Sequence, residues 1–236
     1  MKAAEDNTEK KLASGGLEKH FSSVRPFLGW CSDRHNTNAN HSSFPGLRKP
    51  KNVKDNVERT PFSEEQLNSI FKSYIYTDNL RRGESPKAYQ FWLSLIALTT
   101  GMRIAEIVGL EKEDIKQEDG IWIFDVNGTW HSPSRQNSEY IKDKKNKSSC
   151  RKIIISQRLI SFGFLSYVER LRKHDVLFPE LTLGRKKGLG DYASKWFNGR
   201  FMGYIGLAKQ SVDGSQRVSF HSFRHGFVIY LDKTDI

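Results

Sequence analysis

The chain has 236 residues, a formal charge of +11 and a pI near 9.6. This length fits one domain with an appendage or two small domains, and the excess of Lys and Arg favours an anionic partner, nucleic acid before a membrane surface. No apolar run approaches membrane-spanning length and no apolar signal core opens the sequence, so we expect neither a membrane partner nor export. The two cysteines, Cys31 and Cys150, are too few for a disulfide framework and predict a reducing compartment, the cytoplasm in a bacterium.

Residues 1–56 differ in composition from the rest of the chain. The stretch that begins at Cys31 is rich in Asn, Ser, His and Lys and shows little periodicity. We therefore expect a basic N-terminal segment that is flexible or only locally ordered. Cys31, His35 and His41 are too irregularly spaced to predict a metal site there.

Regular structure is predicted from near Thr60 onward. Ser63 and Gln66 have the spacing of a capping box, which predicts the start of a helix. The segment SPKAYQFWLSLIALTT, from Ser85, is apolar on nearly all faces and predicts a buried central helix. Gly101 ends that helix, and RIAEIVGL begins a short second one. Helical spacing in the first helix is carried by Leu67, Ile70, Phe71 and Tyr74.

The second half of the chain predicts two strands and further helices. Residues 120–128 form one strand bounded by glycines and residues 151–156 form another. RLISFGFLSYVERLRK returns to helical spacing, Asp191 is placed to cap the helix YASKWFNGRFMGYIG, and FHSFRHGFVIYL ends the pattern. Phe223 and Phe227 are expected to face the core. The fold class is α+β, mainly helical with a small antiparallel sheet.

The first of three basic clusters is Arg103 with Glu106. Residues three apart share a helical face, so Glu106 can hold Arg103 in place. Taken alone, this spacing favours an ion pair at the surface that contributes little to stability.

The second cluster lies between the two predicted strands. Six of the eleven residues from Lys142 to Lys152 are basic. By itself this composition favours a solvated hairpin tip. The functional alternative is a hairpin lysine that contacts a phosphate and acts as a general acid.

The third cluster is HSFRH, residues 221–225. His221 and Arg224 lie three apart on one helical face, and together they suit an anionic oxygen, because Arg offers a planar fork and His donates a hydrogen bond. His221 and His225 lie four residues apart, a spacing that two histidine ligands of one metal ion can have on a helix. With no HExxH pattern and no third ligand nearby, zinc is disfavoured.

These clusters, in this order, resemble the catalytic domain of the tyrosine recombinases, the phage integrase family. LTTGMRIAEIVGL is similar to the family signature T-G-x-R-x-x-E-x-x-x-L, KNKSSCRKIII to its lysine-bearing hairpin, and HSFRHGF to its His-x-x-Arg motif. Ile154 stands where the family often has proline. The resemblance extends from about Asn56 to the end of the sequence. Within the family, the sequence also resembles the integrase subgroup of prophages and genomic islands.

The resemblance implies a function and a set of roles. Arg103 and Arg224 would hold the scissile phosphate of double-stranded DNA with His221, and Lys145, or alternatively Lys147, would protonate the leaving 5′-oxygen. Glu106 would support the arginines. The reaction would pass through a 3′-phosphotyrosine that retains the reactivity of the broken bond, so no metal or other cofactor is expected. DNA-binding roles are expected for Lys142, Lys144, Lys147 and Arg151.

The family places a second His or Trp and the nucleophilic Tyr at least one helix beyond His-x-x-Arg, but only twelve residues follow Arg224. Tyr230 lies on the same predicted helix as Arg224 and should point elsewhere. We therefore interpret residues 57–236 as a catalytic domain without its C-terminal end, and residues 1–56 as at most a remnant of the family's core-binding domain. We expect this polypeptide not to cleave DNA by itself.

Two function hypotheses follow. The first is a site-specific recombinase, incomplete here, which at full length would act on attachment sites and self-associate on DNA. The alternative is a non-catalytic basic DNA-binding protein, which would never form a covalent adduct with DNA.

Overall fold

A computed structural model describes residues 14–35, 58–77, 86–136, 150–181, 189–207 and 216–234. The chain divides into two units, Met1–Asn56 and Val57–Ile236. In the first unit, α1 (Ser14–His35) is a helix of 22 residues that contains Pro26. The N-terminal segment thus holds a long helix, most of which precedes the aperiodic stretch that begins at Cys31. In the described part of the chain, no helix has the length and hydrophobicity that crossing a membrane requires.

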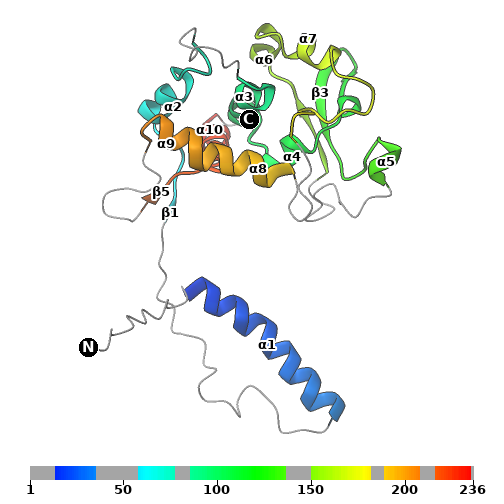
Figure 1. Ribbon diagram of the computed structural model, residues 1–236, viewed down its shortest axis with the longest axis vertical. Helices are drawn as coiled ribbons and strands as arrows, with labels where there is room; N and C mark the ends of the chain where they lie inside the picture. The colour runs from blue at the N-terminus through cyan, green and yellow to red at the C-terminus, as the bar shows by residue number, and fades with distance from the viewer. Residues whose placement is uncertain are drawn as a thin grey trace, which may run out of the picture. The chain divides into compact units, whose positions relative to one another are not determined.

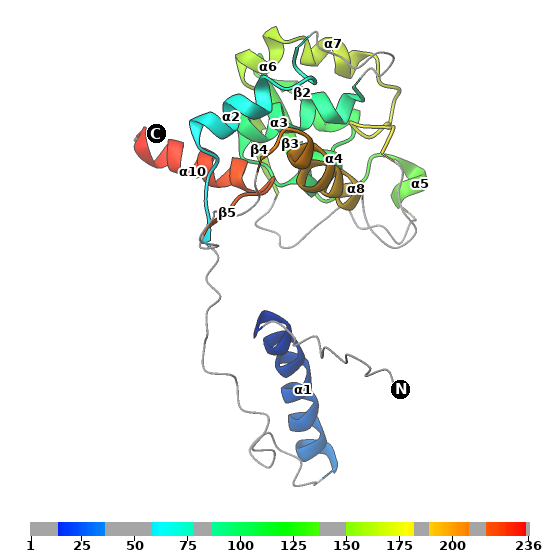
Figure 2. The same cartoon turned by 60° about the vertical axis from the view of Figure 1, so that its left-hand side comes forward.

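The second unit holds the other described helices and all the described strands (Figures 1 and 2). Its elements in chain order are β1 (Glu58–Arg59), α2 (Glu64–Phe71), α3 (Ala88–Thr100), α4 (Ile104–Val108), η3 (Lys112–Asp114), β2 (Ile115–Glu118), β3 (Ile121–Val126), α5 (Pro133–Gln136), β4 (Arg151–Ile154), α6 (Gln157–Ser161), α7 (Phe164–Glu169), α8 (Leu189–Lys195), the π-helical turn η5 (Trp196–Phe201), α9 (Met202–Tyr204), β5 (Gln216–Arg217) and α10 (Ser222–Lys233). This mainly helical α+β architecture confirms the predicted fold class.

The central helix α3 organises the second unit. Leu93, Ile96 and Ala97 on α3 are fully buried, and α4, α6 and α10 pack against this helix. The predicted capping box at α2 is present, because the Ser63 hydroxyl accepts from the Gln66 N–H and the Gln66 side chain accepts from the Ser63 N–H. Both local predictions, the buried helix and the capped one, are confirmed.

Gly101 ends α3 in a left-handed conformation with φ of 61°. A Cβ atom at this position would lie 2.5 Å from Cδ1 of Phe227, whose ring packs over the turn from α10. Only glycine satisfies both the backbone angle and this close approach. The turn therefore brings the start of α4 close to α10.

We expect Gly101→Ala to destabilise the protein by about 2 kcal/mol or more, since the left-handed conformation and the clash with Phe227 both oppose a side chain. Gly120 also has positive φ, but nothing lies within 4 Å of a Cβ built on it. Gly120→Ala is therefore the matched control and should cost about 1 kcal/mol. Urea unfolding measures both, and equal losses would show that Phe227 does not pack on Gly101.

Three antiparallel strands in the order β2-β3-β4 form the small sheet. The two predicted strands are confirmed as β3 and β4. Strand β2 was not predicted, because IKQE has one buried residue, Ile115, and too few residues to show alternation. Phe124 on β3 is fully buried and contacts Phe164 of α7, with ring centroids 5.5 Å apart.

Two predictions about helix boundaries are wrong. The stretch from Arg158 to Lys173 is not one helix, because Gly163, with φ of 86°, separates α6 from α7. Asp191 does not cap the following helix. It lies in the first turn of α8 and forms an ion pair with Lys195 one turn later, at 2.8 Å.

Strands β1 and β5 form a separate parallel pair in which Glu58 is opposite Gln216 and Arg59 is opposite Arg217. Figures 1 and 2 show the two strands side by side at the edge of the unit. Two residues are too few to produce a hydrophobic period, so this pair could not be predicted from the sequence. The pairing places the beginning of the unit beside the segment that leads into α10.

Candidate functional site

Arg103 occupies the N-cap position of α4. Its backbone N–H donates to Glu106 Oε2 at 2.9 Å, and its Nη1 donates to Glu106 Oε1 at 2.8 Å. The Arg103 side chain is 43% exposed, whereas that of Glu106 is only 7% exposed. The pair predicted from spacing is therefore present, and its buried acceptor distinguishes it from an ordinary surface ion pair.

Glu106 also binds Arg151, which lies 45 residues further along the chain at the start of β4. Arg151 Nη2 donates to Oε2 at 2.8 Å and Nη1 donates to Oε1 at 3.3 Å. Burial acts to raise the pKa of Glu106, but the hydrogen bonds from Arg151 and Arg103 outweigh it and lower the pKa below its ordinary value. Glu106 is thus a carboxylate at neutral pH that orients two arginines.

Arg224 on α10 joins this group through the backbone. Its Nη1 donates to the carbonyl oxygen of Gly101 at 2.8 Å, two residues before Arg103. Burial, followed by the positive charge of Arg103, lowers the pKa of the Arg224 guanidinium. Arg103, Arg151 and Arg224 therefore lie near one carboxylate, that of Glu106. Three guanidinium groups around one carboxylate leave the cluster positive.

His221 stands immediately before α10 and is half-buried. Aromatic packing fixes the turn that carries it: Phe220 and Phe223 both contact Phe197, with centroid distances of 5.1 and 5.7 Å. The predicted core position of Phe223 is confirmed, since it is 2% exposed. In addition, the Phe220 N–H donates to Asn198 Oδ1 at 2.8 Å. Residues of η5 thus stabilise the turn both by aromatic packing and by a hydrogen bond.

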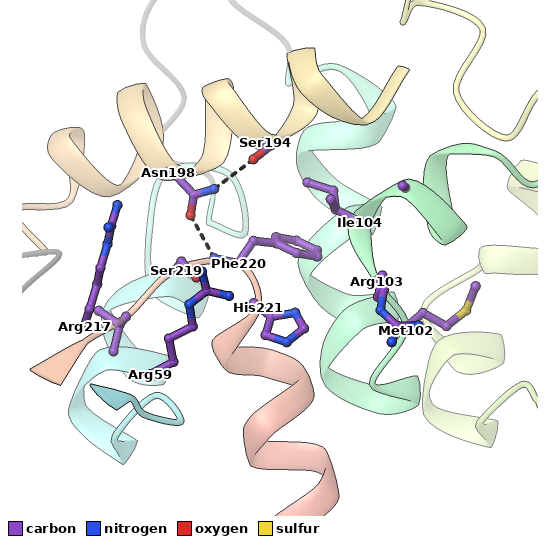
Figure 3. A pocket seen from close by; sticks show the side chains of 12 residues that line it. Arg59, Met102, Arg103, Ile104, Ser194, Asn198, Arg217, Ser219, Phe220 and His221 are labelled. Atoms are coloured by element: carbon purple, nitrogen blue, oxygen red, sulfur yellow. Dashed lines mark hydrogen bonds between the residues drawn. The ribbon is translucent and has the colours of Figure 1, made fainter. Parts of the chain in front are cut away.

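A pocket of about 470 Å³ opens between these elements (Figure 3). Arg103 lies on one side of it and His221 on another, and no acidic side chain occurs among the described residues that line it. The lining residues are Arg59, Met102, Arg103, Ile104, Ala105, Ser194, Asn198, Arg217, Val218, Ser219, Phe220 and His221. A polar, positively charged pocket of this kind suits a phosphate group.

Four predicted site residues, Lys142, Lys144, Lys145 and Lys147, lie outside the described residues. Conversely, sequence reasoning missed Arg59, Ser194, Asn198 and Arg217, which reach the pocket only through tertiary packing. Their surroundings in the sequence contain no motif that could have indicated this role.

Among the residues that the structure describes, one group has a geometry compatible with a metal ion: ligand atoms of Glu111, Asp114 and His131 lie within 4.8 Å of one another. Protein donors already occupy this group. Glu111 accepts from the N–H groups of His131 and Ser132 and from Arg135, while Asp114 accepts from the Glu111 N–H and contacts His131 Nε2 at 2.9 Å. We interpret the group as a structural network that joins η3 to α5.

The chain belongs to the phage integrase family. A model of that family matches residues 58–234, which include all of α10 and every described element of the second unit. Among the described residues that resemble the motifs of tyrosine recombinases, Arg103 and His221 line the pocket, and Arg224 donates to the carbonyl oxygen of Gly101 beside it.

Solved structures show the same fold. The Tn1549 transposon integrase in complex with circular intermediate DNA matches with a TM-score of 0.57 and 17% identity, over 96% of this chain and 69% of that one. The XerH site-specific recombinase bound to palindromic difH substrate, a post-cleavage complex, matches with a TM-score of 0.56 and 17% identity, over 96% of this chain and 57% of that one. No curated protein matches the sequence.

Proposed function

We propose that the chain acts in site-specific DNA recombination and that its basic pocket holds the scissile phosphate of double-stranded DNA. One observation carries the proposal: Arg103, Arg151 and Arg224, from three separate parts of the chain, gather at Glu106 next to His221. Residues 57–236 would form the catalytic part and residues 1–56 a basic N-terminal segment. The Tn1549 integrase and the XerH recombinase are each bound to DNA in their structures, which supports this choice of partner.

Each side chain has a role that follows from its chemistry. Arg103 and Arg224 would bind the non-bridging oxygens, on which negative charge accumulates during phosphoryl transfer, and their guanidinium forks match that geometry. His221 would donate a further hydrogen bond. Glu106 would keep Arg103 and Arg151 oriented before DNA arrives, which reduces the reorganisation needed on binding.

The reaction would proceed in two steps. A tyrosine hydroxyl would attack phosphorus and release its proton to solvent, the bond to the 5′-oxygen would break, and Lys145, or alternatively Lys147, would give that oxygen a proton. A 5′-hydroxyl would then attack the phosphotyrosine and lose its proton, the bond to the tyrosine oxygen would break, that oxygen would take up a proton, and the phosphodiester would be restored. None of the described tyrosines lines the pocket, and Tyr230 on α10 is 63% exposed, so we assign no residue as the nucleophile. The DNA on either side of the scissile phosphate would be contacted by Lys142, Lys144, Lys147 and Arg151. The protein would act on attachment sites and self-associate on DNA.

The test is a fluorescence anisotropy titration of a labelled, mixed-sequence DNA duplex with the full chain at several salt concentrations. We expect binding whose affinity falls linearly with salt on logarithmic axes. Parallel samples on a denaturing gel report covalent adducts: an adduct would establish strand cleavage, whereas salt-sensitive binding without any adduct supports DNA binding alone. Absence of duplex binding would overturn the proposal.

DNA binding should also depend on pH through His221. Burial, then the charges of His225, Arg59, Arg224 and Arg103, lowers the pKa of His221 below its ordinary value of 6.5, so the ring is neutral at pH 7. A phosphate beside it favours the protonated form, and binding should therefore strengthen as the pH falls below about 6.5. Glu106 stays ionised in this range because its own pKa is lowered.

Titrations between about pH 5 and 8 with His221→Gln should show a flatter pH dependence, while His20→Gln, at an exposed position on α1, should match the unaltered chain. The pH dependence of folding stability has the opposite sign. The folded state holds the His221 proton less tightly than the unfolded state does. The stability that neutral His221 contributes is therefore present above pH 6.5 and is lost as the pH falls through the lowered pKa. An unchanged pH profile in His221→Gln would remove His221 from the phosphate site.

A further inference from the structure

The strand pair β1–β5 places two arginines at the edge of the phosphate pocket. Arg59 and Arg217 are directly opposite in the register of the parallel pair, both are exposed, and both line the pocket with Arg103 and His221. In Figure 3 the Arg59 side chain extends toward His221, and the Arg217 side chain runs along the pocket toward Asn198. The two guanidinium groups thus extend the positive surface beyond the site described above.

The positive charge of Arg59 acts on His221. Burial and His225 lower the pKa of His221 most, and Arg59 is the next largest cause. The Arg59 guanidinium must therefore lie near the His221 imidazole. Ser194 and Asn198, on the opposite wall, add polar groups to the same pocket. Arg59 therefore faces the same volume as the residues that would hold the scissile phosphate.

The pair is unfavourable for the protein alone. Like charges directly opposite in paired strands destabilise a sheet, and β1 and β5 have only two residues each with which to offset that cost. In the part of the chain that the structure describes, no carboxylate forms an ion pair with Arg59 or Arg217. A bound anion between or beside the two side chains would remove the repulsion.

We propose that Arg59 and Arg217 form a second phosphate subsite, which binds a backbone phosphate next to the one held by Arg103 and Arg224. This inference rests on the proposed function. Successive phosphates rise by about 3.4 Å along one DNA strand, so a strand seated in the pocket presents its next phosphate within reach of the neighbouring wall. A second fixed phosphate sets the register of the strand and thereby positions the scissile bond.

The test uses the salt dependence of duplex binding by the full chain. Each phosphate contact contributes about 0.9 to the slope of log affinity against log salt. The double variant Arg59→Ala/Arg217→Ala removes this one phosphate contact and should reduce the slope by about 0.9, and each single variant should reduce it by part of that amount. Arg59→Lys should retain the slope, because the charge remains. Arg158→Ala, which removes an exposed arginine of α6 away from the pocket, is the matched control and should leave the slope unchanged.

The outcomes separate this inference from the proposed function. If Arg103→Ala lowers the slope and the Arg59 and Arg217 variants do not, the second subsite is wrong and the proposed function stands. If the unaltered chain fails to bind duplex DNA, the proposed function is overturned and the subsite falls with it. Thermal unfolding adds a check, since loss of the like-charge pair should leave the double variant at least as stable as the unaltered chain. A less stable double variant would indicate a structural role instead.

Discussion

Replacing Arg103 and Arg224 together with alanine is expected to reduce affinity for duplex DNA by about hundredfold or more. A hydrogen bond between charged groups contributes about 1.5–3 kcal/mol, which is roughly tenfold or more for each arginine. Arg103 lines the positive pocket, Arg224 lies close enough to Arg103 for the charge of Arg103 to lower its pKa, and Glu106 holds Arg103 in place before any ligand binds. Fluorescence anisotropy with a labelled duplex measures the loss.

Arg224 also has a structural contact, since it donates to the carbonyl oxygen of Gly101. The single variant Arg103→Ala therefore separates phosphate binding from folding better. The Arg103 side chain is 43% exposed, and its replacement breaks no long-range hydrogen bond to the backbone among the described residues. Arg103→Lys should give an intermediate affinity, because lysine retains the charge but not the planar fork. Arg158→Ala is the control. Unchanged affinity in the double variant, with folding verified by circular dichroism, would rule out the arginine site.

The largest effect on stability is expected from Glu111→Ala. The Glu111 side chain is fully buried and forms an ion pair with Arg135 Nη1 at 3.0 Å, and it also accepts from the N–H groups of His131 and Ser132. Removing the carboxylate leaves Arg135, 23% exposed, beside buried donors that have lost their acceptor. Breaking a buried pair by removing one partner costs about 3 kcal/mol or more.

Urea unfolding followed by far-UV circular dichroism gives the change in the free energy of unfolding. Glu169→Ala, at an exposed position on α7, is the matched control and should change stability by less than about 0.5 kcal/mol. Glu111→Gln keeps the size of the side chain but turns one acceptor into a donor that faces other donors, so it should also destabilise. A stability loss in Glu111→Ala no larger than in the control would show that the network does not support the fold.

Local patterns in the sequence predicted the elements that local interactions determine. The capping box at Ser63, the buried helix α3 and its end at Gly101 are all confirmed, because each depends on neighbours within a few residues. The break at Gly163 was missed, since the apolar spacing continues across it and only the backbone angle separates α6 from α7. Strand β2 was missed because it is short and mostly polar.

The contacts of the candidate site also fall into two groups, those that local spacing or motif order predicted and those that depend on tertiary packing. The pair of Arg103 and Glu106, three residues apart, followed from helical spacing, and the motif order indicated that His221 and Arg224 belong with it. The contact between Glu106 and Arg151 spans 45 residues and depends on how β4 packs beside α4. Arg59 reaches the pocket only because β1 pairs with β5, which no periodicity could indicate.

The most direct measurement is a crystal structure of the full chain bound to a DNA duplex. We expect one backbone phosphate in the pocket of Figure 3, with its non-bridging oxygens within hydrogen-bond distance of Arg103, Arg224 and His221. DNA that lies on another face of the molecule, with no phosphate in contact with Arg103 or Arg224, would contradict the central claim.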